Sequence, residues 1–216
     1  MKTNLGFKHR PFYTIRDMAC DAVGLLQALS IARAHVLGMS MGGMIAQWIA
    51  ADFPDRVITL TVVMTSSGAR GLPAVRGQTR RILLSKPKDA SVEAFAERFV
   101  ALWRTMKGSK SPSTEDAARA LSMLQSSRSL RPEGTGRQML AVICDVGVRD
   151  KALARIRCPT LVIHGKDDTL VPFENGLDVH KRVPGSRWML VEGMGHDPLP
   201  EDQVLWLDAI LAHVQS

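Results

Sequence analysis

The sequence is poor in cysteine and in aromatic residues, and it contains no long apolar run. Its three cysteines, Cys20, Cys144 and Cys158, form no C-x-x-C pair and therefore indicate neither a disulfide framework nor a zinc site. No stretch approaches the roughly 20 apolar residues that a membrane-spanning helix needs. No apolar segment typical of a signal peptide precedes Pro11. We therefore expect a cytoplasmic protein.

Patterns for metal ions and nucleic acids are also missing. No H-x-H or H-E-x-x-H pattern occurs, so we expect no metal and no cofactor. The formal net charge of +7 arises between Ser66 and Arg131, where 13 Lys or Arg residues accompany 5 Asp or Glu residues. A basic segment can bind nucleic acid, but this one has few Phe or Tyr residues and no nucleic-acid motif. A solvated helical surface is the favoured interpretation, and we expect neither a nucleic-acid nor a membrane partner.

The spacing of apolar residues predicts an α/β protein with an inserted segment. Residues 1–65 and 136–216 alternate helices with short strands, which indicates a mainly parallel sheet with helices on both faces. Residues 66–135 lose the strand pattern and are predicted to form a helical lid. The predicted strands are 34–37, 57–64, 160–164 and 188–191, and the predicted helices are 14–29, 42–51, 91–103, 114–124, 137–143, 177–183 and 202–214.

The most informative motif is a G-x-S-x-G stretch formed by Gly38, Ser40 and Gly42, which lies between an apolar strand and an alanine-containing helix. This context is that of a nucleophile elbow, a tight turn that holds a strained serine at a helix N-terminus. We expect Gly38 and Gly42 to let the helix approach the strand. The backbone N–H of Met41 is expected to face a developing oxyanion. An ordinary glycine turn is the alternative.

A serine hydroxyl needs a base and an orienting acid before it can act as a nucleophile. Downstream, Asp167 and Asp168 follow the predicted strand 160–164, and His196 follows the strand 188–191 in a glycine-rich loop. Both loops lie at the carboxyl ends of strands, where open α/β sheets bind ligands. The pattern therefore favours a triad of a serine, one of these two aspartates and His196.

These segments together resemble the α/β-hydrolase superfamily, in its lipase/carboxylesterase-like branch with a helical cap. The sequence around His196 is similar to that of carboxylesterases, polyketide methylesterases and enol-lactonases. Through its G-x-x-D stretch, the resemblance implies that Asp168 rather than Asp167 is the acid. Haloalkane dehalogenases and epoxide hydrolases of this superfamily carry Asp at the elbow, so Ser40 disfavours their chemistry. The matching residues are 34–47, 54–57, 159–165 with Asp168 and Pro172, and 193–196.

The resemblance implies a serine ester hydrolase that cleaves small carboxylic esters through an acyl-enzyme on Ser40. A lactonase or a carbon–carbon bond hydrolase with the same triad is also open, as is a catalytically weak homologue that serves as a binding or interaction module. Relatives usually begin with further strands, one of which leads to a loop with a second oxyanion donor, and this chain begins after them. We therefore expect a truncated α/β-hydrolase fold in which strand 34–37 forms an apolar edge covered in a homodimer or higher oligomer.

Overall fold

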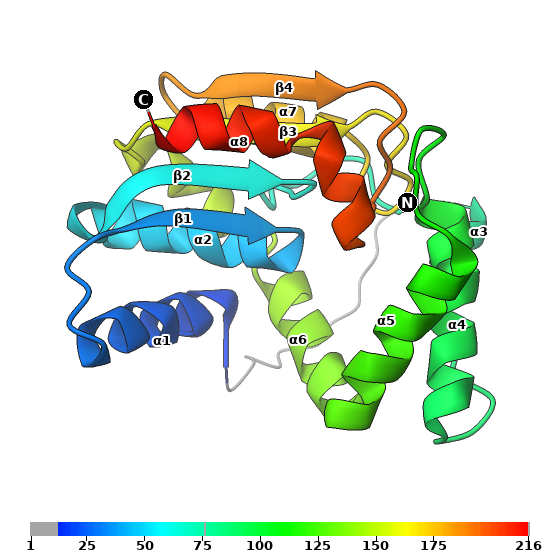
Figure 1. Cartoon of the computed structure of the whole chain (residues 1–216). Coiled ribbons are helices and arrows are strands. Elements are labelled where there is room, and N and C mark those ends of the chain that lie inside the picture. The colour runs from blue at the N-terminus through cyan, green and yellow to red at the C-terminus, as the bar shows by residue number, and fades with distance from the viewer. Residues whose placement is uncertain (1–12, 76, 216) are drawn as a thin grey trace.

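The computed structural model describes residues 13–75 and 77–215. A four-stranded sheet in the order β1-β2-β3-β4 forms its centre (Figure 1), and each neighbouring pair is parallel. Each predicted strand is present within two residues of its predicted ends, and the α/β class with a parallel sheet is confirmed. The strands are β1 (Ala34–Met39), β2 (Val57–Val63), β3 (Thr160–Gly165) and β4 (Arg187–Val191).

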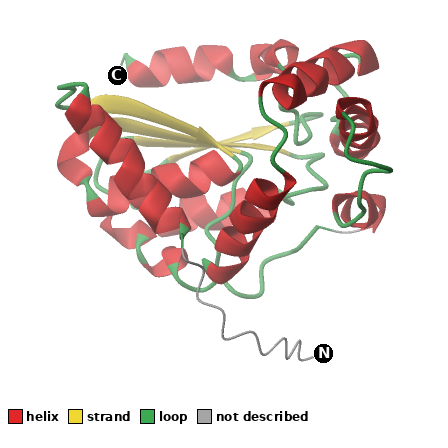
Figure 2. Cartoon of the chain, turned by 90° about the horizontal axis from the view of Figure 1, so that it is seen from below, coloured by secondary structure: helices red, strands yellow, loops and turns green. Residues whose placement is uncertain are grey.

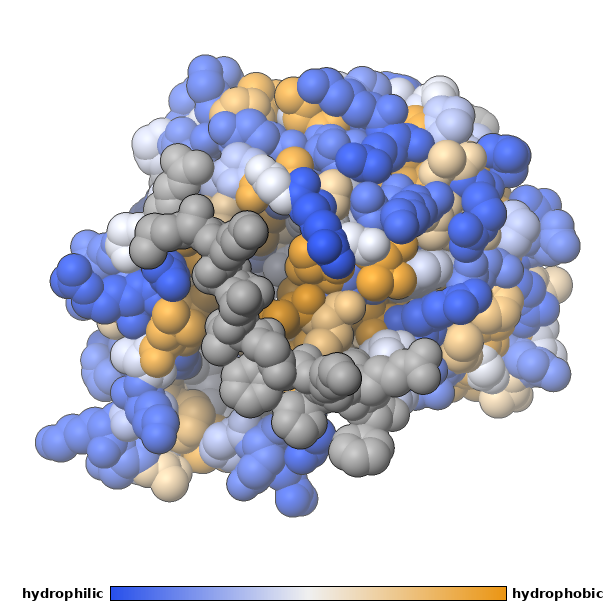
Figure 3. Space-filling view, turned by 180° about the vertical axis from the view of Figure 1, so that it is seen from behind, coloured by the Kyte–Doolittle hydropathy of each residue, from blue (hydrophilic) through white to orange (hydrophobic). Residues whose placement is uncertain are grey.

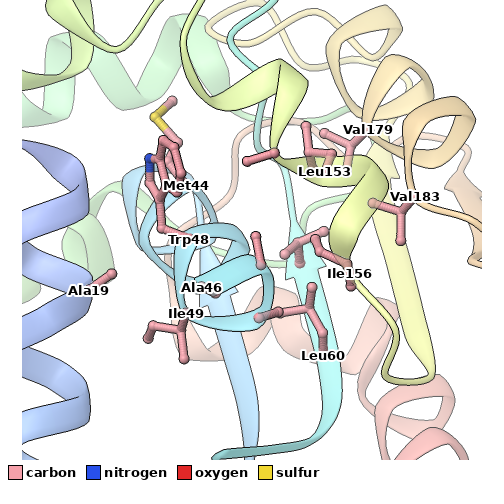
Figure 4. Packing of buried hydrophobic residues seen from close by; sticks show 14 of the residues in the cluster. Ala19, Met44, Ala46, Trp48, Ile49, Leu60, Leu153, Ile156, Val179 and Val183 are labelled. Carbon is pink, nitrogen blue, oxygen red and sulfur yellow. The ribbon is translucent and has the colours of Figure 1, made fainter. Parts of the chain in front are cut away.

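Helices cover both faces of the sheet. Figure 2 shows the strands between the C-terminal helix and other helices of the chain. Helix α2 is the most buried of these helices, and its residues Ala46, Trp48 and Ile49 pack in the main apolar cluster with Leu60 of β2 (Figure 4). The helices of this layer are α1 (Ile15–Ala28), α2 (Met41–Asp52) and α7 (Glu174–Arg182), and α8 (Leu207–Val214) packs in a second cluster.

Three further helices, the outer helices α3, α4 and α5, lie beyond the carboxyl ends of the strands (Figure 1). The side chain of Ser91 caps α4 and that of Thr114 caps α5, each by accepting a backbone N–H. Helix α6 continues from them back to the core, where Ala141 is buried in the main cluster, so the predicted lid boundary at residue 135 falls inside α6. The bounds are α3 (Gly77–Leu83), α4 (Val92–Met106), α5 (Glu115–Arg128) and α6 (Pro132–Cys144).

Two predictions about helices differ from the structure. Helix α3 (Gly77–Leu83) is not among the predicted helices. The single helix predicted over 202–214 is divided into a 3₁₀ helix (Pro200–Leu205) and α8. Trp206 separates them with a ψ of −2° and is only 3% exposed, because its ring packs in the second apolar cluster. Burial of this indole therefore overrides the helical periodicity of the segment.

Strand β1 forms one edge of the sheet. Among the described residues it pairs with β2 alone, and Leu37 on it is 48% exposed. No helix within 13–75 and 77–215 combines the length and the apolar character needed to cross a bilayer.

Candidate active site

The turn between β1 and α2 carries Ser40 in a strained backbone conformation. Ser40 has φ 51° and ψ −120°, a combination that residues with a side chain rarely adopt. A Cβ at Gly38 would lie 2.3 Å from the backbone oxygen of Gly42, and a Cβ at Gly43 would lie 2.7 Å from Cβ of Thr65. The expectation for Gly42 was therefore wrong, because a Cβ there would meet open space. Gly38 and Gly43 are the positions at which the turn leaves no room for a side chain.

Backbone hydrogen bonds fix this turn against the neighbouring strand. The Ser40 N–H donates to the Val63 carbonyl at 2.9 Å, and the Thr65 hydroxyl donates to the Ser40 carbonyl at 2.7 Å. Met41 is the first residue of α2, so its N–H is one of the four that have no acceptor within the helix. The positive end of the helix dipole also lies here. A partly exposed hydroxyl group and an amide donor thus meet at one helix N-terminus.

Asp168 and His196 form a buried pair at the same edge of the sheet, after β3 and β4. The Nδ1 atom of His196 lies 2.8 Å from Oδ2 of Asp168, and each residue is 5% exposed. The other carboxylate oxygen, Oδ1, accepts the N–H groups of Leu170 at 2.9 Å and Val171 at 2.7 Å. Because an ionised carboxylate only accepts hydrogen bonds, the pair fixes the proton of His196 on Nδ1 and leaves Nε2 as a base.

The charge state of Asp168 follows from opposing effects. Burial on its own raises the pKa of this carboxyl group, but the neighbouring His196 and His164 more than offset burial. The net result lowers the pKa of Asp168 from 3.8 to about 2. Asp168 is therefore an anion at neutral pH, as an orienting acid must be.

His164, near the carboxyl end of β3, also contacts the acid. Its side chain is fully buried, and Nε2 lies 2.8 Å from the Val171 carbonyl and 3.4 Å from Oδ2 of Asp168. A Cβ at Gly176 of α7 would lie 2.1 Å from Nδ1 of His164. No local pattern indicates this contact, because His164 lies in β3 and Asp168 lies in the loop that follows the strand.

Asp167, the rival acid, lies outside this pair. Its Oδ2 accepts the backbone N–H of Ser109 at 3.0 Å and the Ser109 hydroxyl at 2.6 Å. These contacts lower the pKa of Asp167. Asp167 thus binds the segment between α4 and α5, whereas Asp168 binds His196.

Two pockets lie near these residues. One of about 180 Å³ is bordered by the first turn of α2 and the segment after Asp168, with Met44, Val142, Leu170 and Val171 in its wall. The other, of about 490 Å³, lies between α3, the end of α4 and Thr169. Apolar side chains also gather near the middle of the face shown in Figure 3. Among the residues that the structure describes, no group of three His, Cys, Asp or Glu side chains is arranged to hold a metal ion.

Known proteins resemble this chain in sequence and in fold. A family model described as "alpha/beta hydrolase fold" matches residues 7–203. The chain is 32% identical to rhodomycin D methylesterase DauP of Streptomyces sp. (strain C5), over 94% of this chain and 74% of that protein. It is 30% identical to the pimeloyl-[acyl-carrier protein] methyl ester esterase of Chromobacterium violaceum, over 91% of this chain and 76% of that protein. The enol-lactonase structure from Burkholderia xenovorans LB400 matches with a TM-score of 0.71 at 19% identity, over 97% of this chain and 76% of that one.

Proposed function

Because this chain belongs to the α/β-hydrolase family, we propose that it is a serine ester hydrolase that cleaves small carboxylic esters through an acyl-enzyme on Ser40. The observation that carries the proposal is the buried bond of 2.8 Å between Asp168 and His196. This pair lies at the same edge of the sheet as the strained turn of Ser40. The methylesterase and the methyl ester esterase among the relatives support the same class of reaction.

The proposed reaction has two stages. Nε2 of His196 takes the proton of the Ser40 hydroxyl while Oγ attacks the acyl carbon of the ester. The N–H of Met41 donates a hydrogen bond to the oxyanion, and Asp168 stabilises the imidazolium. His196 then gives its proton to the leaving alcohol, which leaves an acyl group on Ser40. A water molecule, deprotonated by His196, attacks this acyl group, and His196 returns that proton to Oγ of Ser40 as the bond to the acyl group breaks and the acid is released.

The pockets favour a small acyl or alcohol group. An apolar cavity of about 150 Å³ accommodates a molecule of the size of benzene, and the pocket beside Leu170 and Val171 measures about 180 Å³. We propose that residues 66–135 act as the lid over this space, because the outer helices stand at the carboxyl ends of the strands. The substrate class that follows is an ester with one compact apolar group.

We further propose that the chain forms a homodimer or higher oligomer through the edge of β1 that pairs with no other strand among residues 13–75 and 77–215. An unpaired strand edge presents N–H and C=O groups that invite another chain to pair, and Leu37 adds an exposed apolar side chain. Sedimentation at micromolar concentration should show an oligomer that the variant Leu37→Lys weakens. A wild-type monomer under these conditions would refute the association.

The hydrolase proposal is tested with a series of 4-nitrophenyl esters of increasing chain length. The wild type should hydrolyse the short esters fastest, and a fluorophosphonate should label it. Ser40→Ala should lose both properties. Ser30→Ala is a matched control, because Ser30 is another serine with a positive φ, 56°, but follows the end of α1, before β1 begins, whereas Ser40 follows the carboxyl end of β1. A folded wild type that shows neither labelling nor hydrolysis would rule out the proposed function.

A further inference from the structure

The loop between α4 and α5 is hydrogen-bonded to three aspartates of the C-terminal part of the chain. This segment, the 108–111 loop (Gly108-Ser109-Lys110-Ser111), donates hydrogen bonds to Asp167, Asp197 and Asp202. The Gly108 N–H donates to Oδ1 of Asp197 at 3.0 Å, and the Ser111 hydroxyl donates to Oδ1 of Asp202 at 2.5 Å. Lys110 adds a backbone bond to Gly193, because its N–H donates to that carbonyl at 2.9 Å.

Asp197 differs from the other two aspartates because it directly follows His196. It is fully buried, and its second oxygen, Oδ2, accepts the N–H of Gly195 at 2.7 Å. One carboxylate therefore joins the 108–111 loop to the turn that carries His196. In the opposite direction, the His196 N–H donates to the carbonyl of Met106, the last residue of α4, at 2.9 Å.

The two backbones meet so closely that side chains are excluded between them. A Cβ at Gly108 would lie 2.2 Å from the Gly193 carbonyl oxygen. A Cβ at Gly195 would lie 2.0 Å from the Met106 carbonyl oxygen. Gly108 and Gly195, the two glycines that donate to Asp197, therefore both lie where the two backbones meet. Gly195 and Asp197, the neighbours of His196 in the chain, are joined to each other by one of these hydrogen bonds.

Burying a carboxylate costs free energy, because burial disfavours its charged form. Burial raises the pKa of Asp197, and Asp202 acts in the same direction, while the two N–H donors and His196 oppose them. An apolar side chain of similar size would avoid this penalty but would leave the Gly108 and Gly195 donors unpaired. The carboxylate is suited to holding two amide donors in one plane at a fixed separation.

We propose that Asp197 is a positioning residue for His196: it fixes the histidine turn to the 108–111 loop, so that the imidazole keeps its place on Asp168. This inference rests on the proposed function for its kinetic consequence, while the contact itself is independent of catalysis. Displacement of a catalytic group by about 1 Å can reduce the rate about 100-fold. The loss falls on kcat, because the ester-binding pocket does not include this turn.

The test compares Asp197→Asn with Asp202→Asn. The first replaces an acceptor oxygen by an NH₂ group that cannot accept an N–H. The second alters an equally buried aspartate whose side chain accepts a hydrogen bond from Ser111 of the same loop and not from Gly108 or Gly195. We expect Asp197→Asn to reduce kcat about 100-fold with KM changed less than about twofold. Asp202→Asn should keep kcat within about threefold of the wild type, as a purely structural anchor would.

The second readout is the Nδ1–H signal of His196 in protein labelled with ¹⁵N-histidine. It should move or broaden in Asp197→Asn and stay in place in Asp202→Asn. A wild-type kcat together with an unmoved signal in Asp197→Asn would overturn the proposal. If the wild type hydrolyses no ester, the proposed function fails, but the signal still decides the role of Asp197.

A second variant, Asp197→Ser, keeps one acceptor oxygen in a smaller side chain and replaces Asp197→Asn if the latter does not fold. It should show the same loss of kcat and the same change of the His196 signal. Failure of both variants to fold would make Asp197 a requirement of the fold itself, and would overturn its assignment as a positioning residue.

Discussion

Replacing Ser40 by glycine should make the protein more stable while it removes the proposed nucleophile. Ser40 has φ 51° and ψ −120°, which are the angles of a turn position that glycine dominates. A residue with a side chain held in such a region loses about 1–3 kcal/mol. The Ser40→Gly variant relieves this strain, because a glycine has no Cβ to clash with its own backbone.

The expected gain is smaller than the strain, because glycine also gives the unfolded chain more freedom. That freedom favours unfolding by about 0.4–1 kcal/mol. The net stabilisation is therefore about 1 kcal/mol, which for a chain of this length raises Tm by about 2–4 °C. Ser40→Ala is the matched control, since alanine loses the hydroxyl group but keeps the strained Cβ.

Thermal and urea unfolding of the two variants measure the difference directly. Both variants lack the proposed nucleophile, so differences in bound substrate or product do not enter the comparison. The reasoning is refuted if Ser40→Gly is no more stable than Ser40→Ala. It is supported if the glycine variant gains stability and remains unlabelled by the fluorophosphonate, because strain would then be maintained at the expense of stability.

Three further perturbations probe the surroundings of the turn. The folded-state pKa of Asp168 is lowered from 3.8 to about 2. The wild type should therefore lose about 2 kcal/mol of stability as pH falls from 5 to 2, which lowers the urea midpoint by about 1 M. Asp168→Asn should lack this pH-dependent loss of stability. Gly38→Ala places a Cβ 2.3 Å from a backbone oxygen and should destabilise the fold by about 1–3 kcal/mol, whereas Gly42→Ala, which meets open space, should leave the urea midpoint nearly unchanged. Arg149→Met leaves the buried carboxylate of Asp145 without its ion-pair partner and should cost about 3–5 kcal/mol in urea unfolding, which a loss below 1 kcal/mol would contradict.

Local patterns were sufficient for the strands and for the strained turn. The β-branched run of β2 and the apolar residues before Gly38 each predict a strand without reference to the rest of the chain. The glycines around Ser40 indicate a tight turn, although side chains are excluded at Gly38 and Gly43 and not at Gly42. The caps of α4 and α5 follow the same kind of local rule, because Ser91 and Thr114 directly precede helical periodicity.

Contacts between distant segments were not predictable in this way. The division between the 3₁₀ helix and α8 depends on where the ring of Trp206 packs, and no spacing along the chain records that. His164 looked like any buried strand residue, because its contact with Asp168 depends on how the loop after β3 turns back. Asp197 carries no motif beyond its place after His196, and its partner Gly108 lies 89 residues earlier.

Most of the described basic residues of the middle segment lie on the protein surface, whereas the acidic groups of the candidate site are buried. Arg80, Arg81 and Lys86 are exposed, and the ion pair of Arg104 with Glu115 is also on the surface, as expected for a solvated helical face. The buried carboxylates of Asp168 and Asp197 instead accept hydrogen bonds from backbone N–H groups, and Asp168 also contacts His196. Interactions between exposed charges are screened by salt, whereas short bonds to buried carboxylates are much less so. The histidine turn contacts the end of α4 and the 108–111 loop through buried bonds of the Asp197 carboxylate and of the backbone, so we expect substitutions of the exposed charges on the outer helices to leave its geometry unchanged.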